Sequence, residues 1–197
     1  ANGRPVVTVM PGSRPAEISG CGAIFFEALE RLIKRTGPVT VLVPAINEEA
    51  EKNLPQLAHG YPNVQSSLIV KVGESHKMIE AADAVLVASG TAALECALYK
   101  KPMVVGYKMP GLTGLLMEKK GLINCVSLPN ILLKEKVVPE FLQFFCEPDP
   151  ISWALSDAIE NDKRRAELVE RFSALHESLT ADTAALASDV ITSIAHK

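Results

Sequence analysis

The first candidate site is a turn near the start of the chain that joins a strand-like run to a helix-like run. Apolar residues 6–10 lead into Pro11, Gly12, Ser13 and Arg14. Backbone amides at a helix start and the positive end of the helix dipole favour a bound phosphate. A guanidinium at this position can bind a diphosphate through two parallel hydrogen bonds. The alternative for Arg14 is a solvated side chain, which the helix dipole mildly disfavours.

The second candidate site repeats this arrangement in the middle of the chain. Residues 85–88 are typical of a strand buried on both faces, and Ser89, Gly90 and Thr91 then offer hydroxyls and amides at the next helix start. Glu95, one turn into that helix, is placed to accept two sugar hydroxyls; the alternative is an ordinary surface residue of the helix. If the two turns face each other, they form a cleft for the diphosphate of a nucleotide.

These turns need a scaffold in which two strands end side by side. Apolar runs predict strands at residues 5–10, 39–43, 67–72, 84–88, 103–107 and 125–128. Helical spacing predicts helices at residues 16–35, 47–58, 76–82, 91–99, 112–120, 138–145 and 151–160, followed by charged helices at 163–178 and 180–196. The alternation indicates an α/β fold with a doubly wound parallel six-stranded sheet covered on both faces. In the common strand order 3-2-1-4-5-6, strands one and four are neighbours and their carboxyl ends form the ligand site.

The composition limits the partners. A chain of 197 residues with 48% apolar residues supports one ample globular domain, with or without an appendage. A net charge of -3 argues against nucleic acid as the main partner. Between residues 100 and 136, seven lysines face two glutamates, a local charge of +5. That excess predicts either a surface that meets anionic lipid or phosphate, or a plain solvated face.

Other sequence features predict a reduced protein without a metal. The four cysteines form no Cys-x-x-Cys pair, and the four histidines lack metal-ligand spacing. No apolar run reaches membrane-spanning length, and the N-terminus has no signal-peptide pattern. The chain has no initiator Met and begins its first strand after a few residues, so we expect a piece of a larger protein.

Competing nucleotide and hydrolase motifs do not fit. Gly20 and Gly22 lie inside the first predicted helix and lack the third glycine of a dinucleotide fingerprint. No G-x-x-x-x-G-K-[ST] phosphate loop and no G-x-S-x-G elbow occur in the chain. Asn130 ends a Ser-Leu-Pro-Asn run and is either a site residue or a turn former. The remaining reading is a nucleotide diphosphate held by amides and one arginine in place of magnesium.

Several ordered stretches resemble the lipid-A-disaccharide synthase family over nearly the whole chain. They are P-G-S-R-P-A-E-I at 11–18, A-S-G-T-A-A-L-E at 88–95, K-P-M-V-V-G-Y-K-M at 101–109, V-S-L-P-N-I-L at 126–132 and V-V-P-E-F-L-Q at 137–143. The resemblance implies a GT-B glycosyltransferase, which is built from two Rossmann-like halves with the active site between them. This chain corresponds to the donor-binding half, with residues 1–160 as the UDP-sugar-binding domain.

The family resemblance also implies a reaction and a place in the cell. The family transfers a diacylated glucosamine from UDP-2,3-diacylglucosamine to 2,3-diacylglucosamine 1-phosphate. The product is the β-1,6-linked lipid A disaccharide of lipopolysaccharide, formed with inversion and without metal or cofactor. Because both substrates are lipids, we expect a cytoplasmic enzyme peripheral to the inner membrane. By this likeness the substrate-binding residues are Gly12, Ser13, Arg14, Ser89, Gly90, Thr91, Glu95, Tyr107, Met109 and Asn130.

One departure from the family limits what this chain can do alone. Family members are about twice as long, and the first half, with the acceptor site and general base, is absent. We therefore expect UDP binding without turnover. The helices of residues 161–197 are expected to return to the missing half, to pack locally or fray, or to pair with another copy in a homo-oligomer. The alternatives are a UDP-sugar 2-epimerase-like GT-B domain and a non-enzymatic nucleotide-binding domain.

Overall fold

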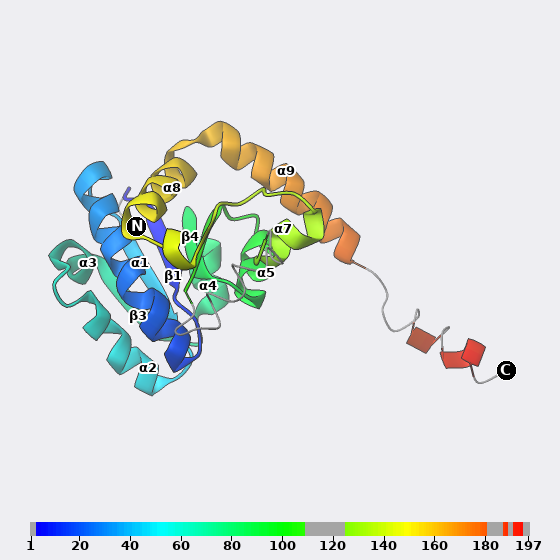
Figure 1. Ribbon diagram of the computed structural model, residues 1–197, viewed down its shortest axis with the longest axis horizontal. Helices are drawn as coiled ribbons and strands as arrows, with labels where there is room; N and C mark the ends of the chain where they lie inside the picture. Colours follow the sequence, from blue (N-terminus) through cyan, green and yellow to red (C-terminus); the bar gives the residue numbers. More distant parts are fainter. Residues whose placement is uncertain (1–2, 109–124, 181–186, 189–190, 195–197) are drawn as a thin grey trace.

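A single parallel sheet organises the protein. The computed structural model describes residues 3–108, 125–180, 187–188 and 191–194. Within them, six strands pair in the order β3-β2-β1-β4-β5-β6, and every pairing is parallel (Figure 1). The strands are β1 (Val6–Met10), β2 (Thr40–Ala45), β3 (Leu68–Val72), β4 (Ala84–Ala88), β5 (Met103–Tyr107) and β6 (Glu140–Leu142). The predicted fold class and the predicted strand order are confirmed.

Helices connect the strands and cover both faces of the sheet. They are α1 (Pro15–Thr36), α2 (Glu48–Asn53), the 3-10 turn η1 (Leu54–Ala58), α3 (Pro62–Ser67), α4 (Ser75–Ala81), α5 (Thr91–Leu98), α7 (Leu128–Leu133), the 3-10 turn η2 (Gln143–Phe145), α8 (Pro148–Glu160) and α9 (Asp162–Leu179). The helix predicted at residues 112–120 lies outside the described residues, as does most of the one predicted at 180–196. Helix α3 was not predicted; its six residues start at Pro62, which suits a first helical position.

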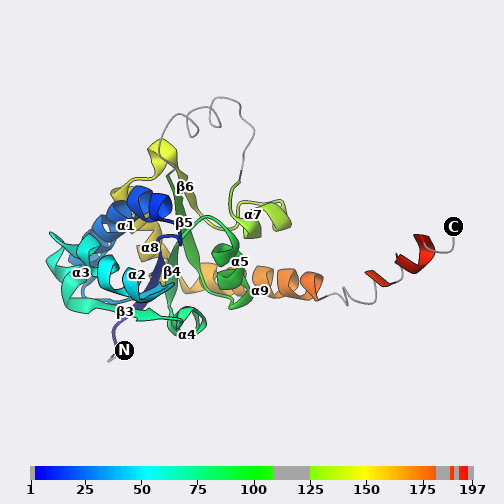
Figure 2. The same ribbon diagram turned by 90° about the horizontal axis from the view of Figure 1, so that it is seen from below.

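The core has two layers because alternate residues of each strand point to opposite faces of the sheet. Val7 and Val9 of β1 pack with Leu29 of α1 on one face, where α8 also lies. Val85 and Val87 of β4 pack on the other face with residues of α4, α5 and α9. Figure 2 shows α1 and α8 on one side of the strands and α5, α7 and α9 on the other. Burial on both faces explains the nearly continuous apolar runs of the central strands.

Two sequence predictions in the second half of the chain were wrong. Residues 125–128 do not form strand six; instead Ser127 precedes helix α7, with Pro129 in its first turn. Residues 138–145 do not form a helix, because this stretch supplies the edge strand β6 and η2. The amide of Val105 in β5 donates to the carbonyl of Pro139 at 3.0 Å, which begins the pairing of β5 with β6. Pairing with a distant strand thus overrides the local helical pattern.

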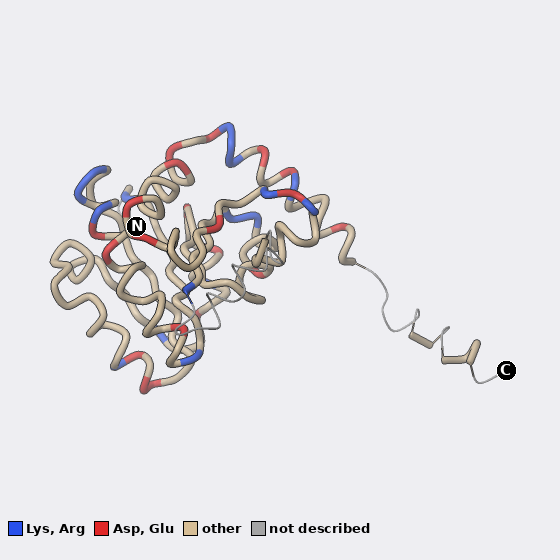
Figure 3. The backbone as a smooth tube through the Cα atoms, in the orientation of Figure 1, with Lys and Arg blue, Asp and Glu red and all other residues tan. Residues whose placement is uncertain are grey.

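Helix α9 packs on the same core as the sheet. Its apolar side chains Leu168, Phe172 and Leu175 are buried with the β4 and β5 residues of the α5 face. The opposite face of the helix is charged, and Figure 3 shows basic and acidic segments following each other along α9. Helix α9 therefore belongs structurally with the sheet, while the predicted division after residue 160 concerns the whole protein and stays a prediction.

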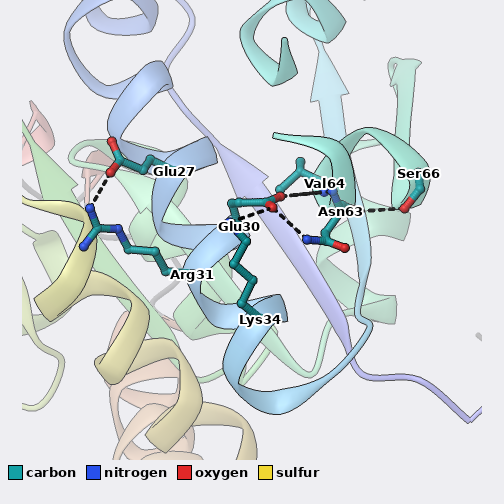
Figure 4. Close-up of polar contacts among 7 residues, drawn as sticks. All are labelled: Glu27, Glu30, Arg31, Lys34, Asn63, Val64 and Ser66. Atoms are coloured by element: carbon teal, nitrogen blue, oxygen red, sulfur yellow. Dashed lines mark hydrogen bonds and ion pairs between the residues drawn. The ribbon is translucent and has the colours of Figure 1, made fainter. Parts of the chain in front are cut away.

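A buried carboxylate joins α1 to α3 (Figure 4). Glu30 is only 3% exposed, and it accepts hydrogen bonds from the Asn63 backbone at 3.1 Å, the Asn63 side chain at 2.7 Å and the Val64 amide at 3.2 Å. The ammonium of Lys34 lies 3.4 Å away. Burial alone raises the pKa of Glu30, but these hydrogen bonds and the Lys34 charge lower the pKa below its ordinary value. The Glu30 carboxylate thus caps the start of α3 by accepting amides of its first turn.

We expect Glu30→Gln to lower the free energy of unfolding by about 1–3 kcal/mol at pH 7, because the amide group turns a donor toward the donors of α3. A folded-state pKa below the unfolded-state value stabilises the protein above about pH 4.3, and this contribution is lost as the pH falls through the folded-state pKa. Urea unfolding of both proteins at pH 7 and pH 3.5 should show the difference shrinking at the lower pH. A control, Glu27→Gln, removes a more exposed carboxylate of α1 that pairs with Arg31; it should change stability by less than about 0.5 kcal/mol.

Candidate functional site

The two predicted turns start at neighbouring positions of one sheet edge. Strands β1 and β4 pair in parallel with Met10 beside Val87, so residues 11–14 and 89–91 both follow at the carboxyl edge. Helix α1 starts from the first turn and packs on one face of the sheet, while α5 starts from the second and packs on the other. This divergence of helices beside adjacent strands is where open α/β sheets bind ligands.

The first turn is held by a carboxylate of its own helix. Gly12 has a φ of 113°, and an added Cβ there would lie 2.5 Å from the Glu17 Cβ, so the turn requires glycine. One Glu17 oxygen accepts the Ser13 amide at 3.0 Å and the Arg14 amide at 3.3 Å. The other accepts the Arg14 guanidinium at 2.8 Å. Amides and arginine thus surround a negatively charged oxygen, as expected of an anion site at a helix start.

Arg14 remains able to turn toward a ligand. Its side chain is 79% exposed, whereas the side chain of its partner Glu17, in the first turn of α1, is 15% exposed. Solvent around the guanidinium weakens this ion pair, and pairs between solvent-exposed groups contribute only about 0–1 kcal/mol. A diphosphate with two or more negative charges is therefore a strong competitor for the guanidinium.

The second turn is open on its outer side. Gly90 has a φ of 137° and no heavy atom within 4 Å of an added Cβ, so a ligand can approach its backbone closely. In the first turn of α5, the Ala93 amide donates to the Gly90 carbonyl at 3.3 Å, and the amides of Thr91 and Ala92 precede the first intrahelical bond. Thr91 is exposed, and Glu95 is half-buried one turn further along. The Ser89 hydroxyl donates to the carbonyl of Val126 at 3.0 Å, which leaves its oxygen able to accept.

The remaining predicted residues are placed differently. Tyr107 ends β5 next to the second turn, because Ala88 pairs with Gly106. Met109 lies outside the described residues. Asn130 is fully buried, and its carboxamide donates to Val138 and Glu140 and accepts from the amides of Val137 and Val138. These bonds use its whole hydrogen-bonding capacity, and a sugar contact would have to break some of them. Its predicted contact with the sugar stays a prediction.

Two glutamates of this region were not predicted from the sequence. Glu17 lies three residues after Arg14, the spacing of a capping box, and that pattern was available as a signal. Glu140 lies in β6 and binds the segment before α7 through Val126, Ser127 and Asn130. No local pattern points to Glu140, because its partners are 10–14 residues away along the chain.

The thiols do not offer a nucleophile near these turns. Burial raises the pKa of Cys96 in α5 to about 12, and the neighbouring Glu95 charge adds to that effect. Burial likewise raises the pKa of Cys146 to about 12. Both therefore stay protonated and unreactive near neutral pH.

Two further observations concern metal binding and membrane crossing in the described part of the chain. There, His, Cys, Asp and Glu side chains form no group of three or more suited to a metal ion. Among the same residues, no helix combines the length and apolar character needed to cross a bilayer.

Solved structures define the class of protein to which this fold belongs. The C-terminal domain of a group 1 family glycosyl transferase from Francisella tularensis aligns with a TM-score of 0.60 at 14% identity, covering 91% of this chain and 87% of that one. A UDP-N-acetylglucosamine 2-epimerase described as putative, from Listeria monocytogenes, aligns with a TM-score of 0.58 at 10% identity, covering 84% of this chain and 39% of that one. The sheet and helices of this chain share the Rossmann-like α/β fold of these solved structures, which is one half of a GT-B fold.

Sequence comparisons identify the family within that class. The profile described as lipid-A-disaccharide synthetase matches residues 2–191. A lipid-A-disaccharide synthase from Cupriavidus pinatubonensis is 41% identical over 186 residues, which is 94% of this chain and 46% of that protein. The chain belongs to the lipid-A-disaccharide synthase family, and it spans about half the length of the curated relatives it matches.

Proposed function

We propose that this chain is the donor-binding half of an inverting glycosyltransferase that makes lipid A disaccharide. The donor is UDP-2,3-diacylglucosamine and the acceptor is 2,3-diacylglucosamine 1-phosphate. The main support is that two helix-start turns lie side by side at the carboxyl edge, one of them already holding a carboxylate on its amides and arginine. The family relationship supplies the sugar and the lipid chains.

Each predicted residue except Asn130 has a role in this proposal. The amides of Gly12 and Ser13 and the Arg14 side chain bind the diphosphate from one side, and Ser89, Gly90 and Thr91 bind it from the other. Glu95 accepts the ribose hydroxyls, and Tyr107 lies near the sugar. Met109 belongs to the same proposed set.

The chemistry divides between the two halves of the enzyme. The 6-hydroxyl oxygen of the acceptor attacks the donor C1, the bond from C1 to the diphosphate oxygen breaks, and UDP leaves with the bonding electrons. Two helix dipoles and Arg14 stabilise this developing charge. The acceptor proton goes to a general base in the other half.

The proposal extends to the surroundings of the enzyme. Lipid substrates require contact with the cytoplasmic face of the inner membrane, and the lysine excess between residues 100 and 136 supports attraction to anionic headgroups. Pairing of two copies through the C-terminal helices is part of the same proposal.

Titration calorimetry with UDP, UMP and ADP tests the binding role. We expect UDP to bind at least tenfold more tightly than UMP, because the second phosphate contacts both turns. UDP should also bind more tightly than ADP, because the family donor carries uridine. Equal binding of UDP and UMP, or none, would contradict it.

A UDP-sugar 2-epimerase remains the second candidate, favoured by the fold similarity to the Listeria protein. The full-length enzyme would then convert UDP-N-acetylglucosamine without a lipid acceptor.

A further inference from the structure

Glu140 of β6 binds the segment that leads into α7. One carboxylate oxygen accepts the Val126 amide at 2.8 Å. The other accepts the Ser127 amide at 3.1 Å, the Ser127 hydroxyl at 2.6 Å and the Asn130 side chain at 2.7 Å. Among the described residues, none of the ion pairs involves Glu140. Four donors take the place of a countercharge, and charge-assisted bonds of this kind are short and strong.

The same segment continues to the second turn. The backbone of Val126 is held on both sides, because its amide donates to Glu140 and its carbonyl accepts the Ser89 hydroxyl at 3.0 Å. A connected path of two hydrogen bonds therefore runs from the edge strand to the turn. Residues 37 positions apart in the sequence, Ser89 and Val126, are brought together by it.

The β6 end of this hydrogen-bond path is fixed by strand pairing. Glu140 pairs with Val105 of β5, and the carbonyl of Pro139 accepts the Val105 amide at 3.0 Å. The buried Asn130 closes the loop by binding the amides of Val137 and Val138, just before β6. Because Glu140 lies in a paired strand, its hydrogen bonds fix the position of Val126, and Val126 in turn holds the Ser89 side chain of the second turn.

We propose that Glu140 is a positioning residue of the donor site, which orients Ser89 through Val126. This inference rests on the proposed function, since it assigns Ser89 to the diphosphate contact. A carboxylate is suited to the role because only an acceptor with two oxygens can hold four donors that converge from one segment. Glutamine keeps the size of the side chain, but it replaces one acceptor oxygen with an NH₂ group. That donor would then face the amide of Val126 or of Ser127, which is also a donor.

A double-mutant cycle of Glu140→Gln and Ser89→Ala, read by UDP calorimetry, tests this link. We expect Glu140→Gln to weaken UDP binding about tenfold and Ser89→Ala about threefold to tenfold, by the usual size of charge-assisted and neutral hydrogen bonds. The double variant should bind no more than twofold more weakly than the weaker single variant, because both changes break one path. Glu135→Gln, which removes an exposed carboxylate of the same loop paired with Arg171, should leave UDP binding unchanged.

The outcomes separate the two proposals. Unchanged UDP binding by Glu140→Gln would overturn the positioning role and leave the donor site intact. Effects of the two changes that multiply in the double variant would also overturn it, because a purely structural glutamate acts independently of Ser89. If wild-type protein fails to bind UDP, the proposed function falls and the positioning role falls with it. If Glu140→Gln does not fold, as judged by circular dichroism, Glu140→Asp replaces it in the cycle with the same expected coupling, because the shorter side chain withdraws the carboxylate from the Val126 amide.

Discussion

Replacing Arg14 with alanine should weaken UDP binding by about 10- to 100-fold. Each hydrogen bond to a charged group contributes about 1.5–3 kcal/mol, and 1.4 kcal/mol corresponds to a factor of ten. To bind the diphosphate, the guanidinium must leave its ion pair with Glu17, and because the Arg14 side chain is 79% exposed this pair is weakened by solvent. Calorimetry with UDP on both proteins measures the change.

A comparison with UMP makes the Arg14 experiment specific. The preference of the wild-type protein for UDP over UMP should largely disappear in Arg14→Ala if the guanidinium binds the second phosphate. Arg171→Ala is the control, because this arginine also pairs with a carboxylate, that of Glu135, but lies on α9. Equal losses in both variants would mean that Arg14 contributes only general positive charge.

Replacing Phe172 with alanine should lower the free energy of unfolding by about 3–5 kcal/mol. This ring is fully buried between α9 and the sheet, in the cluster that contains Val85 and Val87 of β4. Its removal leaves a cavity on the face that also supports α5, the helix that starts from the second turn. Urea unfolding followed by circular dichroism measures the loss.

The Phe172 experiment also tests how α9 is attached. Val169→Ala changes a 40%-exposed residue of the same helix and should alter stability by less than about 1 kcal/mol. A loss below 1 kcal/mol for Phe172→Ala would mean that α9 unfolds separately from the sheet, as expected of a segment that belongs to another half. A single cooperative transition with the large loss places α9 in the same folding unit.

Most of the fold could be predicted because its signals are local. The first five strands are mostly apolar runs bounded by glycine, proline or helix caps, and the central strands β1, β4 and β5, which a parallel sheet buries on both faces, give the clearest ones. The sixth strand has only three residues, Glu140–Leu142, and half-buried side chains. Its strand state depends on pairing with β5, which no window of the sequence contains.

The candidate site divides in the same way. The glycines and hydroxyls of both turns were visible, because a strand followed by Gly-Ser and a helix is a short-range pattern. The role of Asn130 was not, since its partners Val137, Val138 and Glu140 lie across a loop that only the folded chain closes. The Glu17 contact could have been found, because its spacing from Arg14 is that of a helix cap.

The carboxylate of Glu17 has a consequence for how a nucleotide would enter and leave. Because it already orders the first turn, an arriving phosphate meets preformed backbone and exchanges one anion for another. The affinity for the nucleotide is then the difference between two similar interactions: those of its phosphate with the amides and Arg14, and those of the Glu17 carboxylate that it replaces. When a bound diphosphate leaves, the Glu17 carboxylate can accept the same amides again, which favours rapid release of the nucleotide.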